Sequence, residues 1–188
     1  MSQFPSHTID TAPADSKASL EGAKKAFGFV PNLQSHMAES PELLAGYSAL
    51  WDLFGKSTLS AHEQQVVYLT SNFENDCHYC MAGHSTLAKM IGMDAATVAA
   101  LRAGTALPDP KLEALHRLTT IVVRERGFVP DAEIDAFLAA GYTRRNVLEV
   151  ILGVATKVMS NYTNHVVHTD YDAFMKGNEW TKPGTAAA

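Results

Sequence analysis

The sequence predicts an all-α protein, a helical bundle, and three observations support this prediction. Helix-start signals, in which a capping residue precedes proline or an acidic residue, recur along the chain. Apolar residues repeat at steps of three and four, the spacing of one helix face. We find no convincing apolar–polar alternation of the kind that marks a strand. With 188 residues, of which 46% are apolar, the chain is long enough for one domain with a sizeable core.

Each predicted helix begins at a recognisable residue. Ser40 caps a helix with Pro41 at its first position, and this helix runs to about Phe54. Ser60 and Glu63 form the capping box of the next helix. Further helices are predicted to begin at Asp94, Asp109, Pro130 and Thr143, and the first three of these end near Gly104, Gly127 and Gly141.

The helix that follows Thr143 is predicted to be the longest and to run towards Met175. Its apolar positions follow steps of three and four: Val147, Ile151, Val154, Val158 and Tyr162. A polar stripe occupies its later part: Asn161, Asn164, His165, His168 and Asp172. His165, His168 and Asp172 have the spacing of a metal site or a pocket lining, but we favour a polar subunit contact or a solvated face.

The two ends of the chain lack periodicity, so we expect a flexible arm over residues 1–15 and a flexible tail over 178–188. The remaining residues, 16–177, then form a single all-α domain. The net charge of −5 and the absence of Lys/Arg runs argue against a nucleic-acid partner. The first residues do not resemble a secretory signal, and no apolar run reaches the length of a membrane span. We therefore expect a cytoplasmic protein with no membrane partner.

The most informative motif is Cys77-His78-Tyr79-Cys80, followed four residues later by His84. These are the only two cysteines in the chain, and a lone C-x-x-C pair is typical of a redox dithiol. The sequence predicts that they lie in the first turn of a helix capped by Asp76, where the helix dipole favours a thiolate. His84 lies one turn beyond Cys80 and is a candidate base. The helix terminus favours Cys77 as the attacking thiol and the histidine favours Cys80, so spacing alone leaves the choice open.

Two other interpretations of the motif compete with the redox dithiol. Cys77, Cys80 and His84 provide three zinc ligands, but a zinc site needs a fourth ligand or a bound water. Buried cysteines can also be inert packing residues. We favour the dithiol, and we expect no metal and no cofactor. The nearby aromatic residues Tyr47 and Trp51 are predicted to pack on a buried helix face together with Phe54, with substrate lining as the alternative.

Two segments of the chain resemble the core of the alkylhydroperoxidase D / carboxymuconolactone decarboxylase family, and within it the peroxidase-related branch. These segments are Leu59–Val67 and Asn75–His84, and Phe27–Asn32 is similar to an upstream segment common in that branch. The resemblance covers roughly residues 26–176. It implies an all-α fold, a homo-oligomer, and a thiol-dependent peroxidase in which the second cysteine of the pair attacks and the first resolves. On this basis Cys80 is peroxidatic, Cys77 is resolving and His84 is the base.

The sequence departs from the family pattern at two positions. The family relay includes a glutamate twelve residues before the first cysteine, where this chain has Gln65. The histidine often found just before the second cysteine is replaced by Tyr79. Glu63 and Glu74 are the nearby carboxylates, and we propose them as substitutes in a proton relay, although helix capping and solvation are competing roles.

The sequence thus predicts an enzyme that reduces a small hydroperoxide through a dithiol/disulfide cycle and is restored by an external dithiol reductant. Two alternatives stay open. One is a dithiol electron carrier or disulfide reductase with little peroxidase activity. The other is a decarboxylase of the carboxymuconolactone type, whose chemistry does not require the cysteine pair.

Overall fold

The computed structural model describes residues 3–184, and within this range the chain is helical and contains no strand. A short 3₁₀ turn at each end, η1 and η2, flanks the α-helices. The elements in chain order are η1 (Ala14–Ser16), α1 (Lys17–Phe27), α2 (Asn32–Met37), α3 (Pro41–Gly55), α4 (Ala61–Glu74), α5 (His78–Met90), α6 (Ala95–Ala103), α7 (Pro110–Arg124), α8 (Asp131–Ala139), α9 (Arg144–Val167) and η2 (Ala173–Met175). The predicted all-α fold is confirmed.

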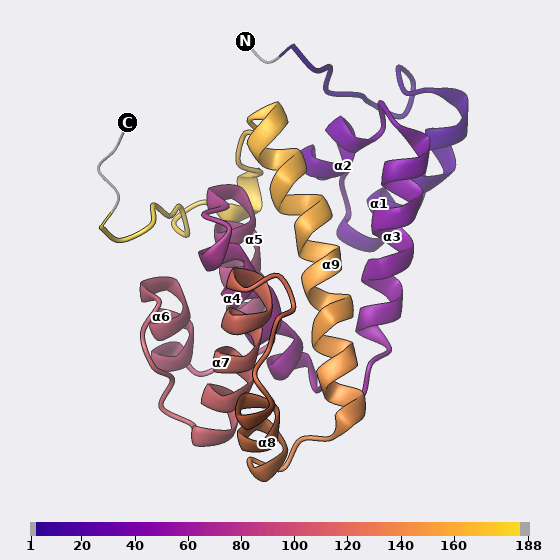
Figure 1. The fold of residues 1–188 in the computed structure, drawn as a ribbon. Helices are drawn as coiled ribbons and strands as arrows, with labels where there is room; N and C mark the ends of the chain where they lie inside the picture. Colours follow the sequence, from indigo (N-terminus) through magenta and orange to yellow (C-terminus); the bar gives the residue numbers. More distant parts are fainter. Residues whose placement is uncertain (1–2, 185–188) are drawn as a thin grey trace.

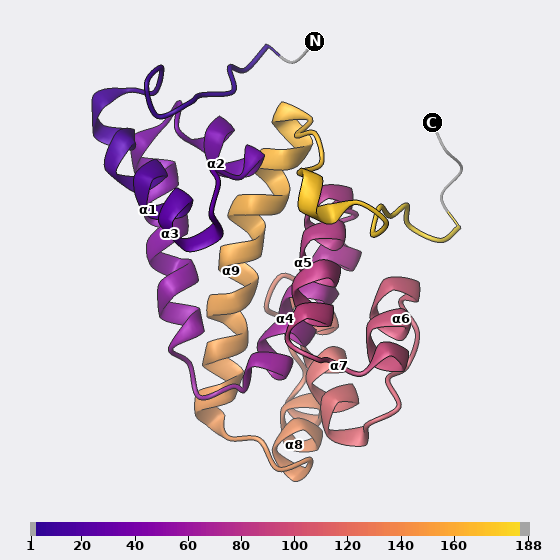
Figure 2. The ribbon, with the colours of Figure 1, turned by 180° about the vertical axis from the view of Figure 1, so that it is seen from behind.

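The long helix α9 runs through the middle of the bundle, with α3 on one side and α4 and α5 on the other (Figures 1 and 2). Helices α6 to α8 pack beyond α4, while α1 and α2 cover the end of α3 near the amino terminus. Buried apolar residues form two clusters. One fills the space around α4, α6, α7 and α8, and the other lies between α1, α2, α3 and α5. The second cluster includes Cys77 and Cys80, so the cysteine pair is part of the packed interior.

The helix starts follow the capping signals in the sequence. The Ser40 hydroxyl accepts a hydrogen bond from the Leu43 amide, and Pro41 takes the first helical position. Ser60 and Glu63 close the predicted capping box of α4. Helices α6, α7 and α9 begin after Asp94, Asp109 and Thr143, each of which accepts a hydrogen bond from a backbone amide of the first turn. Local chemistry therefore sets where these helices begin.

Helix α9 approaches α3 and α4 closely at Gly153. A Cβ atom built on this glycine would lie 2.7 Å from the Phe54 ring and 2.7 Å from Val67. These distances are shorter than ordinary van der Waals contact, so only glycine fits here without a shift of its neighbours. The close approach lets the next turns of α9 reach the cysteines on α5.

The last helix is shorter than predicted. It ends at Val167, and His168 adopts a left-handed conformation with φ of 54°. The prediction that the helix continues towards Met175 is therefore wrong, and Asp172 lies outside it. The reason is tertiary: the Asp172 carboxylate accepts hydrogen bonds from the Tyr79 hydroxyl and the Asn32 amide, which hold the chain after His168 across α5 and α2.

The two flanking segments make packing contacts within the described range. The Ser35 hydroxyl of α2 donates to the His7 carbonyl, and Ala12 is buried. In the predicted tail, Trp180 is buried against Phe73, and its indole N–H donates to the Arg102 carbonyl at 2.8 Å. The remaining parts of the predicted arm and tail, residues 1–2 and 185–188, lie outside the described residues. In the part that the structure describes, no helix is long and apolar enough to cross a membrane.

Candidate active site

The cysteine motif lies at a sharp reversal between two helices. Helix α4 ends at Glu74, and Asp76 follows in the left-handed region with φ of 54°. The Cys77 amide then donates to the Asn72 carbonyl at 2.9 Å, and α5 begins at the next residue. Cys77 is therefore the cap of α5, where Asp76 was predicted, and Cys80 lies in the first helical turn. The reversal places both thiols at the positive end of the helix dipole.

A single amide group lies next to both sulfur atoms. The Nδ2 atom of Asn164, on α9, is 3.1 Å from the Cys80 sulfur and 3.8 Å from the Cys77 sulfur. The Ser160 hydroxyl is 3.8 Å from the Cys80 sulfur. Both cysteines are free thiols and are almost fully buried. An N–H donor this close to a buried sulfur stabilises its thiolate form.

His84 is held by two buried side chains, and neither is a cysteine. Its Nδ1 atom is 2.9 Å from Oε1 of Gln65, and its Nε2 atom is 3.0 Å from Nζ of Lys157. Because the amide oxygen only accepts and the ammonium only donates, these partners assign the ring proton to Nδ1 and the lone pair to Nε2. Burial, reinforced by the positive charge of Lys157, lowers the pKa of His84 well below its usual value. The imidazole is therefore neutral and serves as the acceptor for Lys157.

The surroundings of Cys80 favour its thiolate. Burial alone would raise the pKa of this thiol, but a hydrogen bond from the Cys77 thiol and the positive charge of Lys157 oppose it. Hydrogen bonds from Ser160 and Asn161 add to these effects, and together they lower the pKa of Cys80 to about 5. The same hydrogen bond, followed by burial and the charge of Cys80, raises the pKa of Cys77. The electrostatics thus make Cys80 the thiolate and Cys77 the protonated thiol.

Aromatic side chains enclose the polar centre. The Trp51 and Tyr68 rings stack with centroids 5.3 Å apart, and the Tyr68 ring lies 4.7 Å from that of His84. The Lys157 ammonium is 5.3 Å above the centre of the Tyr68 ring, within reach of a cation–π interaction. Of the predicted aromatic set, Tyr47 and Trp51 border the cavity at Cys80, whereas Phe54 is a fully buried core residue.

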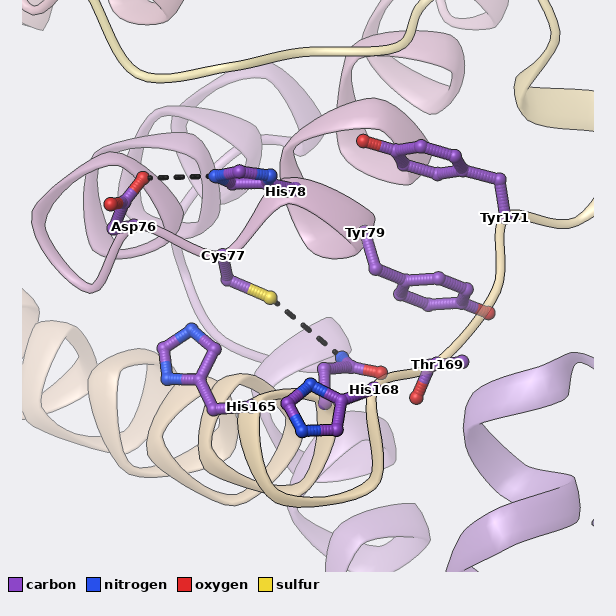
Figure 3. Close-up of a pocket in the computed structure, with 9 residues that line it drawn as sticks. Asp76, Cys77, His78, Tyr79, His165, His168, Thr169 and Tyr171 are labelled. Carbon is purple, nitrogen blue, oxygen red and sulfur yellow. Dashed lines mark hydrogen bonds and ion pairs between the residues drawn. The ribbon is translucent and has the colours of Figure 1, made fainter. Parts of the chain in front are cut away.

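Each sulfur faces a different cavity. A small cavity of about 60 Å³, here called the inner cavity, is bordered by Cys80, His84 and Lys157 and by the rings of Tyr47 and Trp51. A second cavity of about 440 Å³, here called the Cys77 pocket, is bordered by Cys77 together with His78 of α5, His165 at the end of α9 and His168 beyond it (Figure 3). Cys80 does not border the second cavity, and Cys77 does not border the first.

The structure gives the two predicted relay carboxylates other partners. Glu63 accepts from the Ser60 amide at 2.8 Å and pairs with Lys111 at 3.3 Å. Glu74 pairs with Arg124 through contacts of 2.6 and 3.1 Å. His84 instead meets the Gln65 amide and Lys157, so neither carboxylate is among its hydrogen-bond partners.

The predicted polar stripe of α9 divides into buried and exposed residues. Asn161 and Asn164 are buried, and Asn164 contacts the cysteines. His165 and His168 are exposed at the Cys77 pocket, while Asp172 holds Tyr79 and is not on the helix. Over residues 3–184, no group of three His, Cys, Asp or Glu side chains is arranged to hold a metal ion.

Lys157 and Ser160 are the site residues that the sequence prediction missed. Both lie on the buried face of α9, at steps of three and four from Val150, Gly153 and Asn164. The signal in the sequence is a lysine in helical register with buried positions such as Val150 and Gly153, because a fully buried charge requires a dedicated partner.

One family model matches part of the chain. Residues 41–120 match the model of the carboxymuconolactone decarboxylase family, and this segment contains α4, the cysteine motif and His84. This part of the chain is therefore similar to the carboxymuconolactone decarboxylase family. No curated protein matches the chain.

Solved structures of the same fold cover nearly the whole chain. An alkylhydroperoxidase D core protein from Ralstonia eutropha JMP134, described as an uncharacterized peroxidase-related protein, has a TM-score of 0.83 and 18% identity over 96% of this chain and 98% of its own. A peroxidase-related protein from Silicibacter sp. TM1040 has a TM-score of 0.78 and 18% identity over 93% and 95%. The debrominase Bmp8, in a complex with 2,3,4-tribromopyrrole, has a TM-score of 0.77 and 14% identity over 95% and 97%. At these identities the likeness establishes the fold.

Proposed function

We propose that the protein is a thiol-dependent peroxidase in which Cys80 attacks the O–O bond of a hydroperoxide. The observation that carries the proposal is the paired environment of the two sulfurs: Cys80 is a low-pKa thiolate beside Cys77, a protonated thiol, at one shared amide of Asn164. A nucleophilic thiolate next to a resolving thiol is the arrangement that a dithiol peroxidase requires.

The reaction has three balanced steps. The Cys80 thiolate attacks the distal oxygen of ROOH, and the alkoxide leaves as ROH after it takes a proton, so that Cys80 becomes a sulfenic acid. The Cys77 thiol then condenses with this group, and a disulfide and water are formed. An external dithiol reduces the disulfide and is itself oxidised to a disulfide.

We assign the proton for the leaving oxygen to Lys157. Its ammonium lies 3.0 Å from Nε2 of His84 and borders the inner cavity beside Cys80. Because Cys80 is a thiolate at neutral pH, it needs no base in the ground state, whereas the developing alkoxide needs an acid. His84 therefore acts in this proposal as the neutral acceptor that orients Lys157, in place of the base predicted from its spacing. Gln65 accepts a hydrogen bond from Nδ1 and so fixes the orientation of the ring. It occupies the position at which the family pattern has a glutamate.

An entry path to Cys80 lies between α1, α2 and α3. An outer cavity of about 280 Å³ adjoins the inner cavity across four residues that border both of them: Phe27, Gln34, Tyr47 and Trp51. Three of the four are aromatic, so this path favours an organic hydroperoxide with an apolar group close to its O–O bond. The small size of the inner cavity admits the peroxide group and excludes a protein thiol, which supports peroxide reduction over exchange with a protein disulfide at Cys80.

The experiment compares Cys80→Ser and Cys77→Ser with the unmodified protein. Cumene hydroperoxide consumption with dithiothreitol should be lost in Cys80→Ser. Cys77→Ser should still consume about one equivalent in a single turnover and accumulate a sulfenic acid that reacts with dimedone. Full peroxide reduction by Cys80→Ser would contradict the mechanism. Rapid disulfide exchange without peroxide turnover in the unmodified protein would favour the dithiol carrier instead.

We also propose that the chain forms a homo-oligomer, as the family resemblance implies. The outer face of α9 presents large apolar residues at helical spacing, and these are exposed: Leu148, Ile151, Tyr162 and Val166. Such a stripe on a helix that is otherwise packed on two sides is typical of a contact with a second copy.

A further inference from the structure

The two sulfurs of the dithiol open to different sides of the molecule. Cys80 borders the inner cavity, which continues towards α1 to α3, and Cys77 borders the Cys77 pocket between the start of α5 and the end of α9. Figure 3 shows the Cys77 side chain pointing into this pocket, with His165 and His168 on its far side. The reaction with peroxide uses only the first side, which leaves the Cys77 pocket without an assigned role.

We propose that the Cys77 pocket binds the external dithiol reductant, which attacks Cys77 of the disulfide from the side opposite to the peroxide path. This proposal rests on the proposed peroxidase function and adds to it a second binding site with its own ligand class. The two substrates then reach the same disulfide through separate openings and do not compete for one cavity.

The stereochemistry of exchange supports attack at Cys77. A thiolate attacks a disulfide sulfur in line with the S–S bond that breaks. A nucleophile in the Cys77 pocket therefore attacks the Cys77 sulfur from the side opposite to the Cys80 sulfur. The leaving group then is the Cys80 thiolate, which receives a hydrogen bond from Asn164 and faces the charge of Lys157. A sulfur with a low pKa leaves faster, so the same contacts that activate Cys80 towards peroxide also make it the better leaving group.

Two buried oxygen atoms in the pocket wall lack a partner. Oδ1 of Asn164 and Oγ1 of Thr169 are buried and have no hydrogen-bond partner among the described residues. Both residues border the Cys77 pocket, and Asn164 is only 6% exposed. Unpaired buried acceptors of this kind are costly in a folded protein and point to a ligand that donates to them. An incoming thiol S–H is such a donor.

The chemistry of the second step requires a dithiol. Attack by RS⁻ breaks the Cys77–Cys80 bond and leaves Cys77 in a mixed disulfide with R, while Cys80 becomes a thiolate. That thiolate is adjacent to the mixed disulfide and re-forms the starting bond unless a second thiol acts first. A second thiol on the same reductant attacks the R sulfur, releases Cys77 as a thiolate that takes a proton, and leaves as a cyclic disulfide. The pocket volume of about 440 Å³ accommodates a small dithiol of this type.

The imidazole rings at the mouth of the pocket provide proton acceptors for the incoming thiol. His165 and His168 border the pocket and are exposed, and so is His78, whose Nε2 pairs with the Asp76 carboxylate at 3.3 Å. An attacking thiol must lose its proton before it becomes a nucleophile, and a histidine in contact with it is the side chain best suited to take that proton. Of the histidines in the described part of the chain, only His84 borders the inner cavity, and its two nitrogen atoms already have partners.

The first test maps the sulfur that the reductant attacks. The disulfide form of the full chain is mixed with a large excess of mercaptoethanol, quenched in acid at short times before the starting bond re-forms, and alkylated with N-ethylmaleimide in acidic denaturant. The peptides are then analysed by mass spectrometry. We expect the mixed disulfide on Cys77 and the alkyl group on Cys80. A mixed disulfide mainly on Cys80 would overturn the proposal.

The second test separates the two openings with one bulky substitution in each. His165→Trp fills the Cys77 pocket, and Ser48→Trp fills the outer cavity, which Ser48 borders. We expect His165→Trp to slow reduction of the disulfide by dithiothreitol on the order of tenfold or more, with an unchanged rate of reaction between the reduced protein and cumene hydroperoxide. Ser48→Trp should show the reverse pattern. His165→Ala, which leaves the pocket open, should slow disulfide reduction less than His165→Trp does.

The outcomes distinguish this proposal from the proposed function. If Cys80→Ser abolishes peroxide reduction but His165→Trp leaves disulfide reduction unchanged, the peroxidase stands and the second site is wrong. If both bulky variants slow both half-reactions equally, the two substrates share one opening, and the proposal is again overturned. If Cys80→Ser keeps full activity, the peroxidase itself fails, whichever half-reaction the bulky variants affect.

Discussion

Replacing Lys157 by methionine tests the electrostatic origin of the proposed reactivity. Lys157 is 1% exposed, and its ammonium donates to Nε2 of His84 at 3.0 Å. Methionine has a similar length and no charge, so the substitution removes the charge and retains much of the packing volume. The Cys80 thiolate then loses the positive charge that helps to lower its pKa to about 5.

The size of the effect follows from the loss of one opposite charge. A charge close to an ionisable group shifts its pKa by about 1–3 units. A shift of about two units moves the pKa of Cys80 from about 5 to about 7. Near pH 6 the thiolate fraction then falls from about nine-tenths to about one-tenth, so the reaction slows about tenfold through this effect alone. The direction of the pH dependence follows from the lowered pKa of Cys80. Above this pKa the thiol is a reactive thiolate, and the reactivity is lost as the pH falls through the pKa.

The assay is the single-turnover rate constant of the reduced protein with cumene hydroperoxide, measured across the range from pH 4 to pH 9. For the unmodified protein we expect a rise with pH that levels off above the pKa of about 5. For Lys157→Met we expect a higher midpoint and, because the proposed proton donor is also lost, a lower plateau. Lys176→Met removes an exposed lysine and serves as the matched control. An unshifted midpoint would refute the electrostatic argument, and an unchanged plateau would refute the acid role.

Four further substitutions test other parts of the structure. Asn164→Ala removes the amide 3.1 Å from the Cys80 sulfur, so iodoacetamide alkylation should show a raised pKa of this thiol, and an unaltered pH profile would contradict this. Gln65→Glu places a carboxylate beside His84 and should raise the pKa of that histidine, visible as a new ionisation in an NMR titration. Gly153→Ala should lower the free energy of unfolding in urea by about 1–3 kcal/mol, although alanine is the better helix former; an increase would show that the neighbouring helices yield easily. Ile151→Glu, in the exposed stripe, should lower the mass measured by light scattering, and an unchanged mass would exclude this face as the contact.

Helix boundaries were predictable where a local signal sets them. Ser40, Ser60 and Thr143 each cap a helix. The hydroxyl of each accepts a hydrogen bond from the backbone amide three residues later in the chain. The end of α9 was not predictable in this way. Its apolar pattern continues, but Asp172 binds Tyr79 and Asn32, far away in sequence, and the chain turns at His168 to reach them.

The features of the candidate site also divide into those that local spacing indicates and those that depend on tertiary packing. The pairing of Cys77 with Cys80 at a helix start follows from three residues of spacing, so the sequence was sufficient to indicate a dithiol. The partners of His84 were not indicated by spacing, because Glu63 and Glu74 pair instead with Lys111 and Arg124 of α7. Only the packing of α9 against α5 reveals which side chains surround the sulfurs.

The sequence by itself determined the fold class, the helix starts and the identity of the two thiols, because each depends on residues a few positions apart. The tertiary structure decided which side chains surround each thiol and which cavity each cysteine borders. Asn164 contacts Cys80 although the two residues are 84 positions apart in the sequence. Lys157 contacts His84 although they are 73 positions apart. The pKa of a buried thiol depends on the charges, donors and burial around it, and in this protein those are provided by a helix that no local pattern links to the cysteines.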